Sequence, residues 1–264
     1  MSRIASVFRP PDKKALIAYI TLGYPSIEAT LRAVPLLVRA GCDIVELGIP
    51  FSDPLADGAT IQKASFHALQ NGVTPELCLK TARQLRQRVA IPLLFMTYFN
   101  PVSSYGLDRF CHDCAEAGID GLIIPDLPPE EGAELETLTQ QHGIDLVYLL
   151  APTSTESRIR LVADRSRGFI YLVSVTGVTG ARNQLPADLG EFVRRVKQIA
   201  RLPVCVGFGI STPEQAEQVA TSADGVIVGS RLLQLMEAGE GAMSPLEDFV
   251  RDLRKALDKA ARKK

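Results

Sequence analysis

The chain has 264 residues, 46% of them hydrophobic and 22% charged, with a formal net charge of -1. The chain therefore lacks the excess of positive charge that is typical of proteins that bind nucleic acid or an anionic membrane. No apolar run approaches the roughly 20 residues that a membrane-spanning helix needs, and residues 1–9 are too short and polar for a secretory signal. We expect the protein in the cytoplasm, or in the plastid stroma if its source is a photosynthetic eukaryote.

Five cysteines are scattered along the chain, an odd number that indicates reduced thiols rather than a disulfide framework. Cys111 and Cys114 superficially resemble a metal or redox pair. They fall in a helical stretch on one face directed toward the core, and no second pair exists to complete a zinc site. We therefore predict no metal.

Eight short apolar runs recur along the chain, and each precedes a loop and a helix-like stretch. Near-continuous apolarity is typical of strands buried on both faces of a parallel sheet. The predicted strands are Ala15–Thr21, Ile44–Leu47, Pro92–Thr97, Gly121–Ile124, Asp145–Leu150, Ile170–Val173, Pro203–Val206 and Gly225–Val228.

Amphipathic segments between these runs predict helices. Pro75 and Pro213 follow Thr74 and Thr212, which are plausible N-caps. A solvated helix is expected over Arg251–Lys264. The other predicted helices are Ile27–Ala40, Thr74–Val89, Leu107–Ala117, Glu130–His142, Ser157–Arg167, Leu189–Ala200 and Pro213–Thr221, with extra segments over Ala59–Asn71 and Leu232–Gly241.

Eight strand–helix units in about 250 residues, without a linker, predict a single (β/α)₈ TIM-barrel domain over residues 1–264. A doubly wound sheet is the competing fold. The turn after the first predicted strand, Gly23-Tyr24-Pro25, is not a dinucleotide-binding fingerprint. In a barrel, the active site lies at the C-terminal ends of the strands.

A carboxylate, Glu46, stands in the second predicted strand and shares a face with Ile44. Burying an unpaired charge in a strand that is covered on both faces costs free energy. Glu46 is therefore either paired in a structural network or lines a pocket where it moves protons, and we favour catalysis. Asp57 follows in the next loop as a second candidate, whereas Asp53 and Asp126 also suit turns or rim positions.

The loops after strands seven and eight are rich in glycine and contain Gly209, Gly229 and Ser230. Barrels often hold phosphate at these loops, with backbone N–H groups and a helix N-terminus as donors. The alternative is that the glycines merely serve tight turns. The loop after strand six, residues 174–182, is long and rich in small residues, and we expect it to form a lid that closes over the site.

Residue types at the strand ends narrow the chemistry further. The three histidines fall in helical stretches and no lysine lies at a strand end, which disfavours a Ser-His-Asp triad and a Schiff-base aldolase. Acid/base catalysis by Glu46 and Asp57 remains. A flat apolar group attached to phosphate fits the other strand-end residues, which are Tyr19, Met96, Tyr98, Ile123, Leu149, Tyr171 and Phe208.

The segment from Glu46 to Gly58, ELGIPFSDPLADG, resembles the signature of the tryptophan synthase alpha subunit family. Gly177–Gly180, Gly207–Ser211 and Gly229-Ser230 recur in that family in the same order, and the resemblance covers roughly Ile4 to Leu257. It implies a barrel that cleaves indole-3-glycerol phosphate to indole and glyceraldehyde 3-phosphate without cofactor or metal. It also implies an alpha2beta2 tetramer whose beta subunit carries pyridoxal phosphate.

The resemblance also implies roles for individual residues. Glu46 matches the general acid/base, Asp57 the acid that binds the indole N–H, and Tyr171 a tyrosine near the catalytic Glu. Thr179 matches a lid residue that contacts Asp57. The phosphate ligands match Gly180, Gly209, Gly229 and Ser230, and the indole pocket matches Tyr19, Met96, Tyr98, Ile123 and Leu149, with Phe208 beside them.

Two positions depart from some family members: Tyr24, where some carry Asp, and the lid segment 174–177, which lacks an arginine. Three alternative functions stay open. These are a stand-alone indole-3-glycerol-phosphate lyase, another phosphate-binding barrel isomerase or synthase, and a non-catalytic subunit that activates a partner. For an alpha–beta pair, we expect the contact face at Asp53-Pro54 and Tyr98–Ser104.

Overall fold

The computed structural model describes residues 2–10, 12–173, 186, 188–207, 209–237 and 243–262. Within these residues, nine strands form one parallel sheet in the order β5-β4-β3-β2-β1-β9-β8-β7-β6. The strands are β1 Ala15–Thr21, β2 Ile44–Gly48, β3 Leu93–Met96, β4 Gly121–Ile123, β5 Asp145–Val147, β6 Leu149–Leu150, β7 Ile170–Val173, β8 Val204–Gly207 and β9 Gly225–Val228.

The two ends of this sheet, β5 and β6, are consecutive in the chain and are separated only by Tyr148. Val147 pairs with β4 and Leu149 pairs with β7, while the Tyr148 carbonyl accepts the Tyr171 N–H at 3.1 Å. The predicted strand 145–150 is therefore one extended segment that pairs with β4 at its start and with β7 at its end. It closes the sheet into a (β/α)₈ TIM barrel, as predicted.

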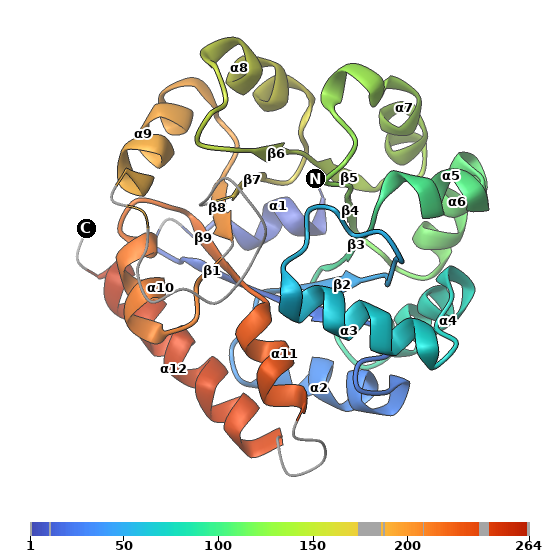
Figure 1. Ribbon diagram of the computed structural model, residues 1–264. Helices are drawn as coiled ribbons and strands as arrows, with labels where there is room; N and C mark the ends of the chain where they lie inside the picture. The colour runs from blue at the N-terminus through green and yellow to red at the C-terminus, as the bar shows by residue number, and fades with distance from the viewer. Residues whose placement is uncertain are drawn as a thin grey trace.

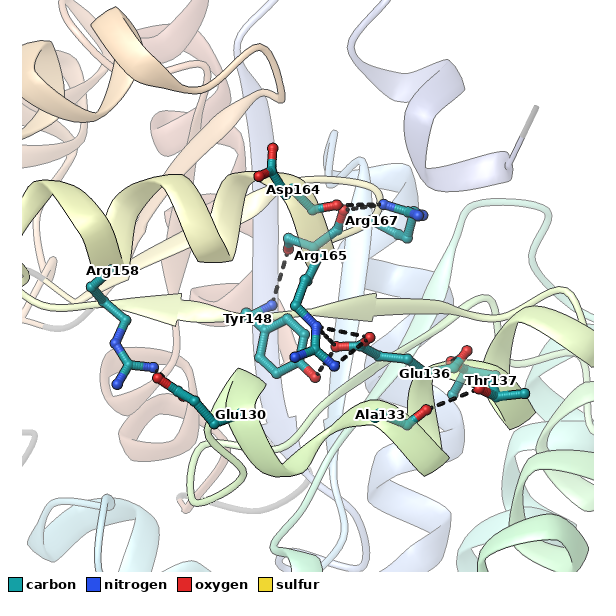
Figure 2. A network of polar contacts seen from close by, with 11 residues as sticks. Glu130, Ala133, Glu136, Thr137, Tyr148, Arg158, Asp164, Arg165 and Arg167 are labelled. Atoms are coloured by element: carbon teal, nitrogen blue, oxygen red, sulfur yellow. Dashed lines mark hydrogen bonds and ion pairs between the residues drawn. The ribbon is translucent and has the colours of Figure 1, made fainter.

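Tyr148 points away from the barrel, because Val147 and Leu149 on either side of it face inward. Its hydroxyl donates to Glu136 Oε1 at 2.6 Å, and Arg165 pairs with the same carboxylate (Figure 2). Arg158 and Glu130 form a second ion pair nearby at 2.6 Å. These contacts join two neighbouring helical segments across the strand that closes the barrel.

Helices surround the strands on all sides (Figure 1). Thr74 and Thr212 cap the helices that begin with Pro75 and Pro213, as predicted, and their side chains accept the N–H groups of Leu77 and Gln215. The helices are α1 Arg3–Val7, α2 Ile27–Arg39, α3 Ala59–Gln70, α4 Pro75–Arg86, α5 Phe99–Tyr105, α6 Leu107–Glu116, α7 Ala133–Gln141, α8 Glu156–Arg165, α9 Leu189–Ile199, α10 Pro213–Ala220, α11 Ser230–Glu237 and α12 Met243–Ala261, with a short 3₁₀ helix, η1, over Pro129–Glu131.

Two helical predictions need correction, and two short helices, α1 and α5, were not predicted. The segment predicted as one helix over residues 130–142 is divided into η1 and α7, which meet at Gly132. The final helix begins at Met243 rather than Arg251, and a solvated helix is wrong there, because one face of α12 buries Leu246, Val250, Leu253 and Leu257.

Helix α1 closes one end of the barrel. A Cβ atom added at Gly121, the first residue of β4, would lie 2.7 Å from Ile4 Cδ1, and one at Gly168, before β7, would lie 2.8 Å from Ile4 Cγ2. Ile4 is fully buried. The N-terminal ends of the strands are thus sealed by an apolar side chain, and the C-terminal ends remain for a site. None of the described helices is both long and apolar enough to cross a membrane.

Candidate active site

A cavity of about 490 Å³, including its open mouth, lies at the C-terminal ends of the strands. Its walls combine apolar side chains, a carboxylate and glycine-rich backbone. The lining residues are Tyr19, Asp57, Ile61, Met96, Tyr171, Gly209, Ile210, Ser211, Ile227, Gly229, Ser230 and Arg231.

Glu46 lies in the middle of β2, beside Tyr19 of β1 and Leu94 of β3. The side chain is 0% exposed, and neither carboxylate oxygen has a hydrogen-bond partner among the described residues. Burial alone raises its pKa from 4.5 to about 8. The structural-network explanation for Glu46 is therefore not supported, and a carboxyl group that exchanges protons near neutral pH remains.

Asp57 stands just before α3 and is 5% exposed. Burial raises its pKa from 3.8 to about 7, against the smaller opposing effect of a hydrogen bond with Tyr98. The Tyr98 hydroxyl also accepts the Ala56 N–H at 3.0 Å, which holds the loop in place. Asp57 Oδ1 has no partner among the described residues. The pKa of each carboxyl group is thus raised toward neutrality. Asp57 lines the cavity, whereas Glu46 does not and lies behind its wall, near the lining residues Tyr19 and Tyr171.

Two tyrosines reach sideways over glycines of the neighbouring strands. A Cβ atom on Gly48 of β2 would lie 2.3 Å from the Tyr19 hydroxyl oxygen, and one on Gly207 of β8 would lie 2.4 Å from that of Tyr171. Any larger residue at either glycine would displace the ring. The missing side chains therefore let both hydroxyls lie inside the barrel mouth, and desolvation raises both phenol pKa values well above their usual range.

The loops after β8 and β9 form another wall of the cavity. Gly209 has a φ of 85°, a left-handed conformation that favours glycine. The Gln215 side chain accepts the N–H groups of Ser211 and Thr212 at 2.8 and 3.2 Å and orders the first loop. Ser230 begins α11, so backbone N–H groups and the positive end of the helix dipole meet here. This arrangement can hold an anion.

The structure brings together most of the predicted site residues. Tyr19, Asp57, Met96, Tyr171, Gly209, Gly229 and Ser230 all line the cavity. Ile123 is buried in β4, and Leu149 lines a neighbouring cavity. The predicted residues Thr179, Gly180 and Phe208 lie outside the described part of the chain.

Sequence reasoning missed several lining residues, including Ile61, Ile227 and Arg231. Ile227 lies on the inward face of β9, in register with Ile17, so strand alternation could have identified it. No comparable signal marked Ile61, which lies on α3. Within the described residues, no group of three or more His, Cys, Asp or Glu side chains could hold a metal ion.

The family model described as tryptophan synthase alpha chain matches residues 6–261. The chain belongs to this family. It is 58% identical over 258 residues to the tryptophan synthase alpha chain of Dehalococcoides mccartyi, covering 98% of this chain and 100% of the relative. It is 49% identical to the alpha chain of Geobacter sulfurreducens, covering 97% of this chain and 99% of the relative.

Solved structures of the family share the fold. A tryptophan synthase structure from Mycobacterium tuberculosis matches with a TM-score of 0.90 at 40% identity, covering 97% of this chain and 98% of that chain. The alpha subunit from Legionella pneumophila matches with a TM-score of 0.91 at 37% identity, covering 98% and 99%. As a member of this family, the protein is a carbon–carbon lyase of tryptophan biosynthesis that cleaves indole-3-glycerol phosphate. Its family implies a phosphorylated substrate and a beta-subunit partner.

Proposed function

We propose that Glu46 performs the proton transfers of this cleavage and that Asp57 stabilises the positive charge they create. Protonation of indole C3 leaves positive charge on the ring, which Asp57 stabilises while it binds the ring N–H. Glu46 takes the proton from the glycerol hydroxyl beside the ring and helps to deliver a proton to C3. The bond between C3 and the glycerol carbon then breaks, and its electrons return to the ring. Indole and glyceraldehyde 3-phosphate result.

The observation that carries this proposal is the fully buried Glu46 carboxyl group without a hydrogen-bond partner among the described residues. Its pKa of about 8, and that of about 7 for Asp57, suit groups that give and take protons near neutral pH. Burial raises the pKa of Tyr171, and the charges of Glu46 and Asp57 raise it further, so this tyrosine lies near both carboxylates. We propose that it completes the catalytic set.

For the substrate phosphate we propose Gly209, Gly229 and Ser230 as ligands, supported by the glycine-rich wall and the N-terminus of α11. Gly180 as a further ligand and Thr179 as a lid residue stay predictions. For the indole ring we propose a set of apolar and aromatic residues, of which Tyr19 and Met96 line the cavity. The remaining members of the predicted indole pocket are Tyr98, Ile123, Leu149 and Phe208.

We further propose that residues 1–264 act as one barrel domain in an alpha2beta2 tetramer in the cytoplasm. The chain itself uses no cofactor in this proposal, and pyridoxal phosphate belongs to the beta subunit. Asp53 and Leu55 lie in the loop that carries Asp57, and Leu55 is 84% exposed. An exposed leucine beside the mouth supports the predicted contact face.

The test is to incubate the purified chain with indole-3-glycerol phosphate and to measure indole, with and without the cognate beta subunit. The chain contains no tryptophan, so indole fluorescence stands clear of the protein's own emission. We expect slow release by the chain alone, activation by the beta subunit and a complex in sedimentation. High activity alone without a complex would indicate a stand-alone lyase. No indole under either condition would refute the proposal.

A further inference from the structure

Two buried hydroxyl groups stand together above Glu46 at the barrel mouth. Thr21 is the register partner of Gly48, the residue over which Tyr19 reaches, and the two hydroxyl oxygens are 3.3 Å apart. Gly48 follows Glu46 by two residues on the same face of β2. The hydroxyl pair therefore occupies the next layer of the barrel between Glu46 and the open end.

This pair keeps hydrogen-bonding capacity that the described residues do not use. Each hydroxyl offers one donor and two acceptor positions, and within the described part of the chain the two hydroxyls bond only to each other. Burial, with a smaller contribution from the charge of Asp57, raises the pKa of Tyr19 well above its ordinary value. Tyr19 consequently keeps its proton and remains a donor. Both residues are buried, Tyr19 at 6% and Thr21 at 0% exposure, so water competes little for the bonds.

The opposite side of the Tyr19 ring faces the anion-binding wall. A Cβ atom on Gly229 would lie 3.1 Å from Tyr19 Cδ1, and both residues line the same cavity. Tyr19 thus extends from the proposed phosphate end to the layer directly above Glu46. The substrate is held by its phosphate at one end, and the bond that breaks joins the ring to the first glycerol carbon at the other end. The carbon between that first carbon and the phosphate-bearing carbon lies along this path. That carbon carries a hydroxyl group.

We propose that the Tyr19 hydroxyl, which lines the cavity, binds the central hydroxyl of the glycerol side chain, between the phosphate-bearing carbon and the carbon whose bond breaks. Thr21 does not line the cavity and acts as a positioning residue, because its hydroxyl bonds to that of Tyr19. The inference rests on the proposed function and deepens it. Tyr19 then has a polar role beside its apolar contacts. Its phenol selects a three-carbon phosphate that carries this hydroxyl, and it fixes the rotation of the substrate's glycerol chain over Glu46. A substrate without this central hydroxyl would leave the Tyr19 hydroxyl without its hydrogen bond to the ligand.

The test compares two unreactive ligands by calorimetry, glycerol 3-phosphate and 3-hydroxypropyl phosphate, which differ only in the central hydroxyl. Tyr19→Phe removes one hydroxyl and keeps the ring, and Thr21→Val removes the other and keeps the shape. A hydrogen bond of this kind contributes about threefold to tenfold in affinity. We expect each variant to weaken glycerol 3-phosphate by about that factor and to leave 3-hydroxypropyl phosphate unchanged.

Tyr148→Phe is the matched control, since it removes a buried tyrosine hydroxyl on the outer face of the barrel, where it donates to Glu136 (Figure 2). This variant should bind both phosphates as the unaltered chain does. Equal weakening of both ligands by Tyr19→Phe and Thr21→Val, or no weakening of either, would overturn the inference. Calorimetry does not depend on turnover. A failure of the proposed function would appear separately, as absence of indole release by the unaltered chain.

Discussion

Three carboxylates at the closed end of this barrel have surroundings opposite to those of Glu46 and Asp57. Asp43, Asp120 and Asp224 directly precede β2, β4 and β9, and each accepts a backbone N–H from a neighbouring strand at 2.9–3.0 Å while pairing with at least one cation. Glu46 and Asp57, toward the other end, are as deeply buried or more so, yet their carboxylates have no cationic partner among the described residues. The cations of the first group are Lys13, Arg254, Arg3, Arg86 and Lys197.

The comparison separates two uses of the same chemical group. A carboxylate that joins strand N–H groups to basic side chains contributes to stability, because its desolvation is offset by charge-assisted hydrogen bonds. A carboxylate buried without partners is costly in its charged form and holds its proton to higher pH. The paired aspartates stabilise the closed end of the barrel. The unpaired carboxyl groups give the open end groups that can transfer protons.

The largest expected effect follows from Glu46→Gln, which keeps the side-chain shape and removes its proton chemistry. General acid–base catalysis contributes about 10²–10⁴-fold, so indole formation should fall by at least the lower figure. Urea unfolding should show no loss of stability at neutral pH, because the native carboxylate has no hydrogen-bond partner to lose in the part of the chain that the structure describes. A decrease below about tenfold in a folded variant would remove Glu46 from the mechanism.

Asp57→Asn should have the next largest effect. The substitution keeps a group that can bond to Tyr98 but removes the negative charge opposite the developing indolium ion. Loss of one electrostatic contact to a transition state costs about 10²–10³-fold. Steady-state indole release should show the decrease mainly in kcat, and calorimetric binding of inorganic phosphate should be unaffected. Full activity of this variant would refute the assigned role.

The pH dependence of stability provides a third test. The folded pKa of Glu46, about 8, lies above its unfolded value of about 4.3, so the folded state retains a proton that the unfolded state has lost between these pH values. The free energy of unfolding should therefore fall as pH rises through this window. Glu46→Gln should remove part of that decline, with an advantage of several kcal/mol near pH 8.5 that shrinks toward pH 5. A difference independent of pH would contradict the raised pKa.

The smallest of these effects is expected for Asp120→Asn at the closed end. The variant weakens the bonds to Leu93 N and Arg86, which are 2.9 and 2.7 Å long. Hydrogen bonds to charged groups contribute about 1.5–3 kcal/mol each, and the free energy of unfolding should fall by an amount of that order. Indole formation at 25 °C should be unchanged. An activity loss without a stability loss would mean that the two ends of the barrel are not independent.

The amino-acid sequence by itself determined the barrel and the position of its mouth. Strands Ala15–Thr21, Ile170–Val173 and Gly225–Val228 have the predicted bounds, because strands buried on both faces are uninterrupted apolar runs. The rule that barrel sites lie at strand ends then identified Asp57, Gly209 and other cavity residues. The specific chemistry, however, came from the resemblance of the Glu46–Gly58 segment to one family, since strand ends alone could not name indole.

The tertiary structure decided which side chains meet across strands. Three features depend on register between neighbouring strands: the pairing of Tyr148 to strands on either side, the position of Tyr19 over Gly48, and the lack of a partner for Glu46 among the described residues. The burial of α12 likewise depends on α10 and α2, which pack against it. Local periodicity reports which face of an element is apolar. It does not report what lies opposite, because closure of the barrel brings together residues that are far apart in the chain.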